Sequence, residues 1–189
     1  MKYNLALFAS GSGSNVENIF NYYKGHKSIS VSSVLTNNKN AYVLKRAKKL
    51  NIESFTFDSN NDELQVLSFL LSNNTTHIIL AGYLKLISPK LIEIYKDKIL
   101  NIHPSLLPKF GGKGYYGSFV HESVINSNEK YSGITIHLVN KQYDKGKILF
   151  QKKIRVNNSD SVESLSNRIH NLEYKFYPHI IEKYILNKL

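Results

Sequence analysis

Short apolar runs alternate with helix-type patterns along the first half of the chain. The run at 5–9, "LALFA", precedes a glycine-rich segment, and such continuous apolar runs are typical of strands buried on both faces. The segments between the runs are longer and place apolar residues at helical spacing. The expected strands are 3–9, 29–36, 53–57, 77–81 and 99–102, and the expected helices are 15–23, 41–50, 62–71 and 89–95. This alternation predicts an α/β fold with a doubly wound, mostly parallel sheet.

The second half has a different pattern. Two strand-like runs, 133–139 and 147–156, are joined by a polar loop, which predicts an antiparallel pair at the C-terminal side of the sheet. A helix is expected over 161–186, with a break or kink at Pro178. No linker rich in Pro, Gly or Ser divides the chain, so we expect one domain over residues 1–189.

Composition narrows the classes of protein. A net charge of +11 and a pI near 9.6 raise nucleic-acid binding as a hypothesis, but the lysines are spread along the chain and form no clustered footprint. A basic surface also attracts small anionic substrates. The chain has no cysteine, which excludes disulfides and thiolate catalysis. No apolar stretch approaches the roughly 18 residues that span a bilayer, and we expect a cytoplasmic protein.

The segment "FASGSGSN", residues 8–15, follows the first expected strand and opens the first expected helix. Small residues let the backbone approach a ligand, and the free N–H groups of a helix start can hold an anion. A dinucleotide fingerprint needs a third glycine where the chain has Val16, and no GK[ST] ending of a nucleotide P-loop is present. The loop therefore predicts either monophosphate binding or only a tight turn with Ser14 or Asn15 as helix cap.

Asn101 and His103 lie two apart at the end of an apolar run. In a strand, such residues project to the same side, and Pro104 favours an extended conformation for His103. An amide and an imidazole at one point suit a carbonyl reaction, because both can stabilise an oxyanion; the alternative is a pair of loop-capping groups. Asp144, in the loop "VNKQYDKGK", either makes an Asx-turn or lies beside His103 and favours its charged form.

Five blocks of the chain, in order, resemble the phosphoribosylglycinamide formyltransferases: "FASGSGSN", "AGYLKLISP", "NIHPSLLPKF", "GITIHLVNKQYDKGKILFQ" and "EYKFYP". The resemblance implies a Rossmann-like formyltransferase fold. It also implies transfer of the formyl group of 10-formyltetrahydrofolate to the amine of N1-(5-phospho-D-ribosyl)glycinamide, in de novo purine biosynthesis. The expected partners are these small molecules, with no metal, nucleic acid or membrane, and the expected assembly is a monomer or homodimer.

The resemblance also implies roles for individual residues. Residues 1–100 would form a nucleotide- and phosphate-binding half, and residues 101–189 a catalytic and folate-binding half. Protonated His103 would be held charged by Asp144. The implied catalytic residues are Asn101, His103 and Asp144; the substrate-binding residues are Gly13, Ser14, Asn15 and Glu173; and the folate-binding residues are Leu84, Lys85, Leu86, Ile87, Asn101 and Asn140.

Some positions depart from the family pattern or keep two interpretations. Asn60 and Lys85 stand where many relatives carry arginines, which affects the expected folate-tail contacts. Lys113, in "GGKG", is either a ligand contact or part of a flexible turn, and His137 is either a site residue or a packing residue. The alternative functions are a folate-dependent deformylase, methionyl-tRNA formyltransferase, a sugar-nucleotide formyltransferase, a nucleic-acid-binding module and a non-catalytic nucleotide-binding protein.

Overall fold

The computed structural model describes residues 2–189 and contains one seven-stranded sheet. Its strand order is β3-β2-β1-β4-β5-β6-β7. β1 (Tyr3–Phe8) pairs in parallel with β2 (Ile29–Thr36) and with β4 (His77–Leu80), and β2 pairs in parallel with β3 (Glu53–Thr56). The strand order reverses direction at β1, as in doubly wound folds. The predicted α/β class with a mostly parallel sheet is therefore confirmed.

The chain separates into two compact units, Met1–Leu100 and Asn101–Leu189. We call them the N-terminal unit and the C-terminal unit. The expectation of one domain with two functional halves stays a prediction.

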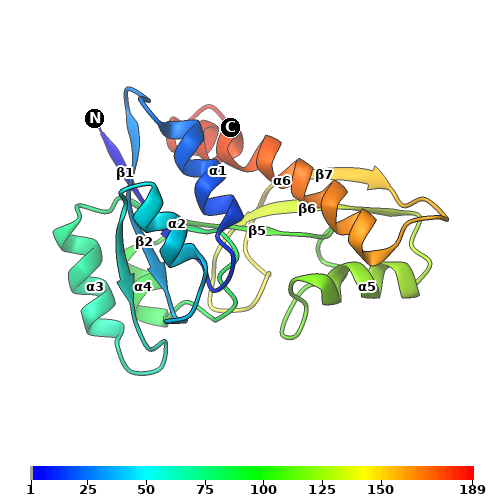
Figure 1. Cartoon of the computed structure of the whole chain (residues 1–189), viewed down its shortest axis with the longest axis horizontal. Helices are drawn as coiled ribbons and strands as arrows, with labels where there is room; N and C mark the ends of the chain where they lie inside the picture. Colours follow the sequence, from blue (N-terminus) through cyan, green and yellow to red (C-terminus); the bar gives the residue numbers. More distant parts are fainter. Residues whose placement is uncertain (1) are drawn as a thin grey trace. The chain divides into compact units, whose positions relative to one another are not determined.

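In the N-terminal unit, helices connect the parallel strands. α1 and α2 pack against each other and against β2, and Figure 1 shows α3 on the opposite side of these strands. Ser88 caps α4 by accepting a hydrogen bond from the Leu91 N–H, and Pro89 occupies the first turn as expected. The helices are α1 (Ser14–Tyr23), α2 (Val43–Lys49), α3 (Glu63–Ser72) and α4 (Pro89–Ile94).

The C-terminal unit is built on an antiparallel pair and two helices (Figure 1). β6 (Tyr131–Leu138) and β7 (Ile148–Arg155) are antiparallel, which confirms the predicted pair. α6 (Val162–Ile185) packs on β6 and on α5 (Ser118–Asn126), a helix that the sequence analysis did not predict. β5 (Ile99–His103) brings the chain into this unit.

Of the break or kink expected at Pro178, the break is absent, because α6 continues through this residue as one element, and the kink stays a prediction. A proline removes one backbone hydrogen bond from a helix interior. Tyr177 and Ile181, on either side of Pro178, are completely buried. Their burial keeps the segment helical, since packing overrides an unfavourable local propensity.

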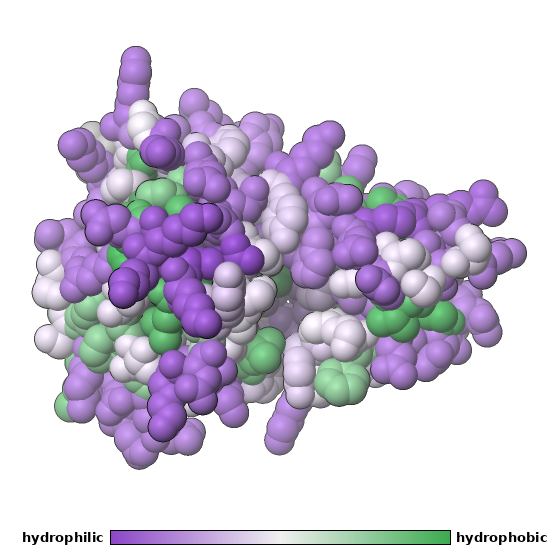
Figure 2. All heavy atoms as spheres, viewed as in Figure 1, coloured by the Kyte–Doolittle hydropathy of each residue, from purple (hydrophilic) through white to green (hydrophobic). Residues whose placement is uncertain are grey.

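β7 lies at the edge of the sheet and carries charge there. Lys152 and Lys153 are exposed, and their ammonium groups lie 6.0 and 5.0 Å from the ring centroids of Phe176 and Tyr131. The face of the molecule in Figure 2 is covered mainly by hydrophilic residues, with small apolar patches. Within residues 2–189, no helix is both long enough and apolar enough to cross a membrane.

Candidate active site

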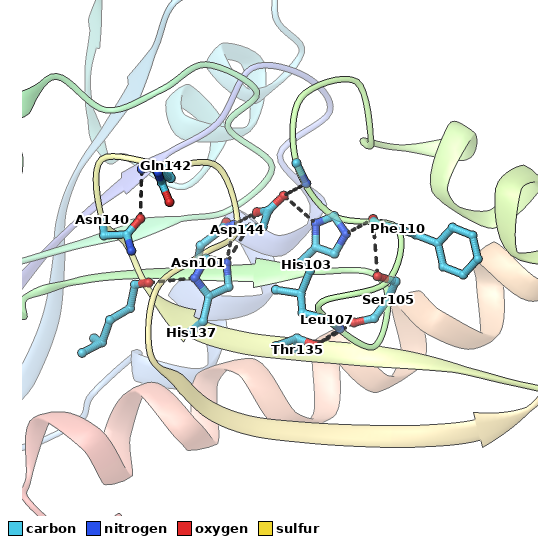
Figure 3. A network of polar contacts seen from close by, with 12 residues as sticks. Asn101, His103, Ser105, Leu107, Phe110, Thr135, His137, Asn140, Gln142 and Asp144 are labelled. Carbon is cyan, nitrogen blue, oxygen red and sulfur yellow. Dashed lines mark hydrogen bonds and ion pairs between the residues drawn. The ribbon is translucent and has the colours of Figure 1, made fainter.

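Three polar side chains of the C-terminal unit meet where β5 ends (Figure 3). The Asn101 Nδ2 atom lies 3.4 Å from Asp144 Oδ1, and the His103 Nδ1 atom lies 3.6 Å from Asp144 Oδ2. Asn101 and His103 thus project to the same side of the strand, as their spacing predicts. The structure brings together all three residues that the resemblance implies as catalytic.

The loop between β6 and β7 holds Asp144 in place. Asp144 has a left-handed backbone (φ 53°), which Asp tolerates better than most residues, and its Oδ2 accepts the Gly112 N–H at 2.9 Å. Its side chain is only 11% exposed. A carboxylate that is nearly buried and directed at two neighbouring side chains is more than part of an Asx-turn.

His103 is buried and has a polar neighbour on each side of its ring. It is 4% exposed, and its Nε2–H donates to the Phe110 carbonyl at 2.7 Å, so the lone pair of the neutral ring is on Nδ1, facing Asp144. Burial lowers the pKa of His103, and this outweighs Asp144 and the Phe110 carbonyl, which raise it. This direction favours the neutral ring near pH 7 in the free protein, and the expectation that Asp144 keeps His103 charged stays a prediction.

Asp144 itself is ionised. Burial, the largest single influence, raises its pKa, but neighbouring groups, among them His103 and the Gly112 N–H, together bring the pKa below its usual value. The site thus holds a buried carboxylate next to a neutral imidazole. Protonation of that imidazole during a reaction would create an ion pair in a setting that excludes water.

His137 belongs to the same network. Its Nε2 atom lies 3.1 Å from Asn101 Nδ2 and 3.6 Å from Asp144 Oδ1, and its Nδ1 atom lies 2.7 Å from the Leu138 carbonyl oxygen (Figure 3). Of the two interpretations of His137, these contacts favour a site residue.

A second group of ionisable side chains surrounds Glu173 in α6. Glu173 is 5% exposed and accepts a hydrogen bond from His170 Nδ1 at 2.9 Å, and this bond raises the pKa of His170. His121 in α5 is 2% exposed, and burial lowers its pKa to about 4. The sequence analysis missed His121 and His170. Only the position of His121 beside the apolar residue Val120 could have indicated its burial.

The glycine loop belongs to the N-terminal unit and forms the start of α1. Gly13 is the N-cap residue in a left-handed conformation (φ 73°), and α1 has no side-chain cap. Ser14 and Asn15 lie inside the first helical turn, so the expected cap from either residue is wrong. A Cβ atom on Gly13 would lie 2.3 Å from a methyl carbon of Val43, so the helix start leaves room only for glycine.

The expected folate-binding segment of the N-terminal unit follows β4. Leu84 and Leu86 are 44% and 46% exposed, whereas Ile87 is buried. The Leu84 N–H donates to Ser10 Oγ at 3.0 Å, which holds the segment in place, and Lys85 is exposed. Exposed apolar side chains on a fixed backbone fit a flat aromatic ligand.

The remaining expected positions are exposed or half-buried. Asn140, in the C-terminal unit, is half-buried and accepts the Gln142 N–H at 2.9 Å (Figure 3). Asn60 and Lys113 are exposed. Over residues 2–189, no group of at least three His, Cys, Asp or Glu side chains is arranged to hold a metal ion.

Comparison with known proteins shows the family of the chain. The family model described as formyl transferase matches residues 3–181, and the chain belongs to this family. A curated phosphoribosylglycinamide formyltransferase from Bacillus subtilis is 37% identical over 185 residues, covering 94% of this chain and 92% of that protein. Within the family, the chain falls in the group of phosphoribosylglycinamide formyltransferases.

Two further comparisons extend this finding. The chloroplastic phosphoribosylglycinamide formyltransferase of Vigna unguiculata is 40% identical over 185 residues, covering 94% of this chain and 59% of that protein. The chain therefore spans about three fifths of that relative. The crystal structure of phosphoribosylglycinamide formyltransferase from Bacillus halodurans matches with a TM-score of 0.87 and 33% identity, covering 95% of this chain and 94% of that chain.

Proposed function

We propose that the protein transfers the formyl group of 10-formyltetrahydrofolate to the amine of N1-(5-phospho-D-ribosyl)glycinamide. The products are formylglycinamide ribonucleotide and tetrahydrofolate, as in de novo purine biosynthesis. One observation carries the proposal: Asp144 lies 3.4 Å from the Asn101 amide and 3.6 Å from the His103 imidazole. This arrangement supplies what acyl transfer to an amine requires, namely an oxyanion donor and a group that moves protons.

In the proposed mechanism, the neutral amine attacks the formyl carbon and a tetrahedral oxyanion forms. An Asn101 N–H donates to that oxygen. The proton released from the attacking nitrogen passes to His103, which is neutral in the free protein because burial lowers its pKa. Asp144 then stabilises the imidazolium, and the proton moves to N10 of the folate as the C–N bond breaks. The amine loses one proton and N10 gains one, so the reaction balances.

The remaining roles concern binding. We assign Gly13, Ser14 and Asn15 to the phosphate, because N–H groups at a helix start attract anions. Glu173 is assigned to the glycinamide end of the substrate, where a carboxylate attracts an amine. For the folate, the assigned residues are Leu84, Lys85, Leu86, Ile87, Asn101 and Asn140.

The test is an assay of formyl transfer, with hydrolysis in the absence of amine as the control reaction. The intact protein is compared with Asp144→Asn, which removes the charge at nearly constant volume, and with His77→Asn, which alters a buried histidine outside the proposed site. We expect transfer by the intact protein and by His77→Asn, and a large loss in Asp144→Asn. Hydrolysis without transfer would instead indicate a deformylase, and no turnover would indicate a binding protein.

The cytoplasmic location and the assembly as a monomer or homodimer stay predictions. Sedimentation equilibrium would distinguish the two assemblies.

A further inference from the structure

His137 lies at an irregularity of the β6–β7 pair. The register of this pair shifts between Ile136 and His137, and such a bulge re-aims a side chain. The Leu138 N–H is bonded to the Lys147 carbonyl at 2.9 Å, while the Leu138 carbonyl accepts from His137 at 2.7 Å. A Cβ atom on Gly146 would lie 1.6 Å from this carbonyl oxygen. The Leu138 N–H is thus fixed by the strand pair. The Leu138 carbonyl lies so close to residue 146 that only glycine fits there.

The Leu138 carbonyl decides which ring nitrogen of His137 carries the hydrogen. A carbonyl can only accept, so Nδ1 is the protonated nitrogen, and in the neutral ring Nε2 keeps its lone pair. The residue is only 2% exposed, so little water can reach it. At 3.1 Å from Nε2 lies the Asn101 amide nitrogen, which is a donor.

The orientation of the Asn101 amide follows from this tautomer. In the opposite orientation, the amide oxygen would face the Nε2 lone pair and the Asp144 carboxylate, and three acceptors would meet without a hydrogen. In the observed one, one N–H is directed to His137 at 3.1 Å and the other to Asp144 at the longer distance of 3.4 Å. The second hydrogen bond is the weaker one and the easier to exchange.

We infer that His137 is a positioning residue that anchors one N–H of Asn101 and so leaves the other N–H for the reacting oxygen. The inference rests on the proposed function, in which Asn101 stabilises the oxyanion. His137 acts only through Asn101, and the fixed tautomer is what prevents the amide from presenting its oxygen to that anion.

Two variants separate the two sides of the imidazole. His137→Asn places an amide near the Nδ1 position, so it keeps a donor for Leu138 but has no acceptor for Asn101. His137→Gln is longer and extends an acceptor toward the Nε2 position. We expect kcat to fall about 10- to 100-fold in His137→Asn, as when an orienting partner is lost. The KM values should stay nearly constant, and His137→Gln should recover most of the kcat.

A role in packing alone gives a different pattern. Both variants would then lose activity in proportion to their loss of thermal stability, and that result would overturn the inference. His77→Asn is the matched control, because it makes the same substitution at a buried histidine in the N-terminal unit. It should leave kcat unchanged.

Coupling to Asn101 gives the second criterion. If His137 acts through Asn101, then His137→Asn should lower kcat in the intact background but hardly at all in the Asn101→Ala background. Additive losses in the double variant would overturn the inference.

The tautomer can be measured without any activity. Nitrogen-15 NMR of the labelled protein should show His137 with a protonated Nδ1 and an unprotonated Nε2, and the Asn101 side-chain amide signal should shift in His137→Asn. An Nε2–H tautomer would overturn the inference even if formyl transfer is observed. Absence of transfer by the intact protein, with the Nδ1–H tautomer present, would instead overturn the proposed function.

Discussion

The two units of the molecule offer different kinds of chemical group. In the N-terminal unit, the candidate contacts are mainly backbone: the start of α1 after Gly13 and the segment 84–87, of which residues 84–86 are exposed. In the C-terminal unit they are ionisable side chains, of which His103 and Glu173 are nearly completely buried. Backbone groups are the same in every residue, so the first unit depends on conformation. The second depends on burial, because burial sets the protonation states of its side chains.

This contrast teaches that the two kinds of site fail in different ways. A binding loop made of backbone fails when a Cβ atom distorts it, and the effect should appear mainly in KM. A buried side-chain cluster fails when one member is removed or changes charge, and the effect should appear mainly in kcat.

The largest effect is expected in the C-terminal unit. Asn101→Ala removes the proposed oxyanion donor and should lower kcat about 100- to 1,000-fold, on the order of 3–4 kcal/mol in the barrier. The KM values for both substrates should change little, since the donor acts on the transition state. Steady-state kinetics measure both constants. A rise in KM at constant kcat would contradict the expectation that changes in the C-terminal unit act mainly on kcat.

The matching change in the N-terminal unit is Gly13→Ala. The added Cβ meets Val43 at a left-handed position, so the start of α1 must shift, and we expect the KM for the ribonucleotide to rise about tenfold, equivalent to about 1.4 kcal/mol. Gly25→Ala is the control, because Gly25 has a similar φ of 76° but open space around it. Both variants should lose stability, but only Gly13→Ala should alter KM; a fall in kcat alone would contradict the expectation.

A pH-dependent loss of stability should be shared by the two units. Burial lowers the pKa of both His77 and His121 to about 4, and in His77 the charge of Lys98 adds to this. The unfolded chain takes up these protons near pH 6.5, so stability is fully present above that pH. It should fall by up to about 1.4 kcal/mol per pH unit per histidine toward pH 4.

Urea unfolding at pH 7 and pH 5 measures this loss. His77→Phe and His121→Phe should each reduce the difference between the two pH values. Equal pH dependence in the variants and the intact protein would show that these histidines are not the cause.

The smallest effect is expected at two helix caps, one in each unit. Ser88 and Ser161 accept hydrogen bonds from backbone N–H groups at 3.3 and 3.1 Å. Replacing either serine by alanine should lower the free energy of unfolding by about 1 kcal/mol, the usual cost of losing a cap. Neither variant should change kcat or KM. A change in kcat or KM would show that loss of the helix cap affects activity as well as stability in the unit that carries it.

Much of the fold could be predicted because its local signals agree with one another. The strand β2 (Ile29–Thr36, "ISVSSVLT") has the predicted bounds, since its β-branched residues favour a strand although serines interrupt the apolar positions. The helix α5 was missed because it is short, follows a glycine-rich segment and buries few side chains, among them Val120 and His121. The break expected at Pro178 is absent, since a rule based on local sequence does not include the packing of the neighbouring residues.

The sequence predicted which residues form the candidate site, but not their protonation states. The spacing of Asn101 and His103 predicted their shared direction. The polar loop offered Asp144 as a possible partner of His103, and the resemblance implied its catalytic role. Whether burial or the neighbouring carboxylate decides the charge of His103 depends on how deeply the ring is enclosed. That depth arises from contacts between distant segments, such as the one with Phe110 in the loop after β5.

The lysines of β7 bear on aggregation of the protein at high concentration. An unpaired strand edge is a template on which another chain can add a strand, and this is how many proteins aggregate. Lys152 and Lys153 place two positive charges on that edge, so a second edge of the same kind is repelled. We therefore expect the strand that completes the sheet to disfavour the addition of a further strand from a second copy.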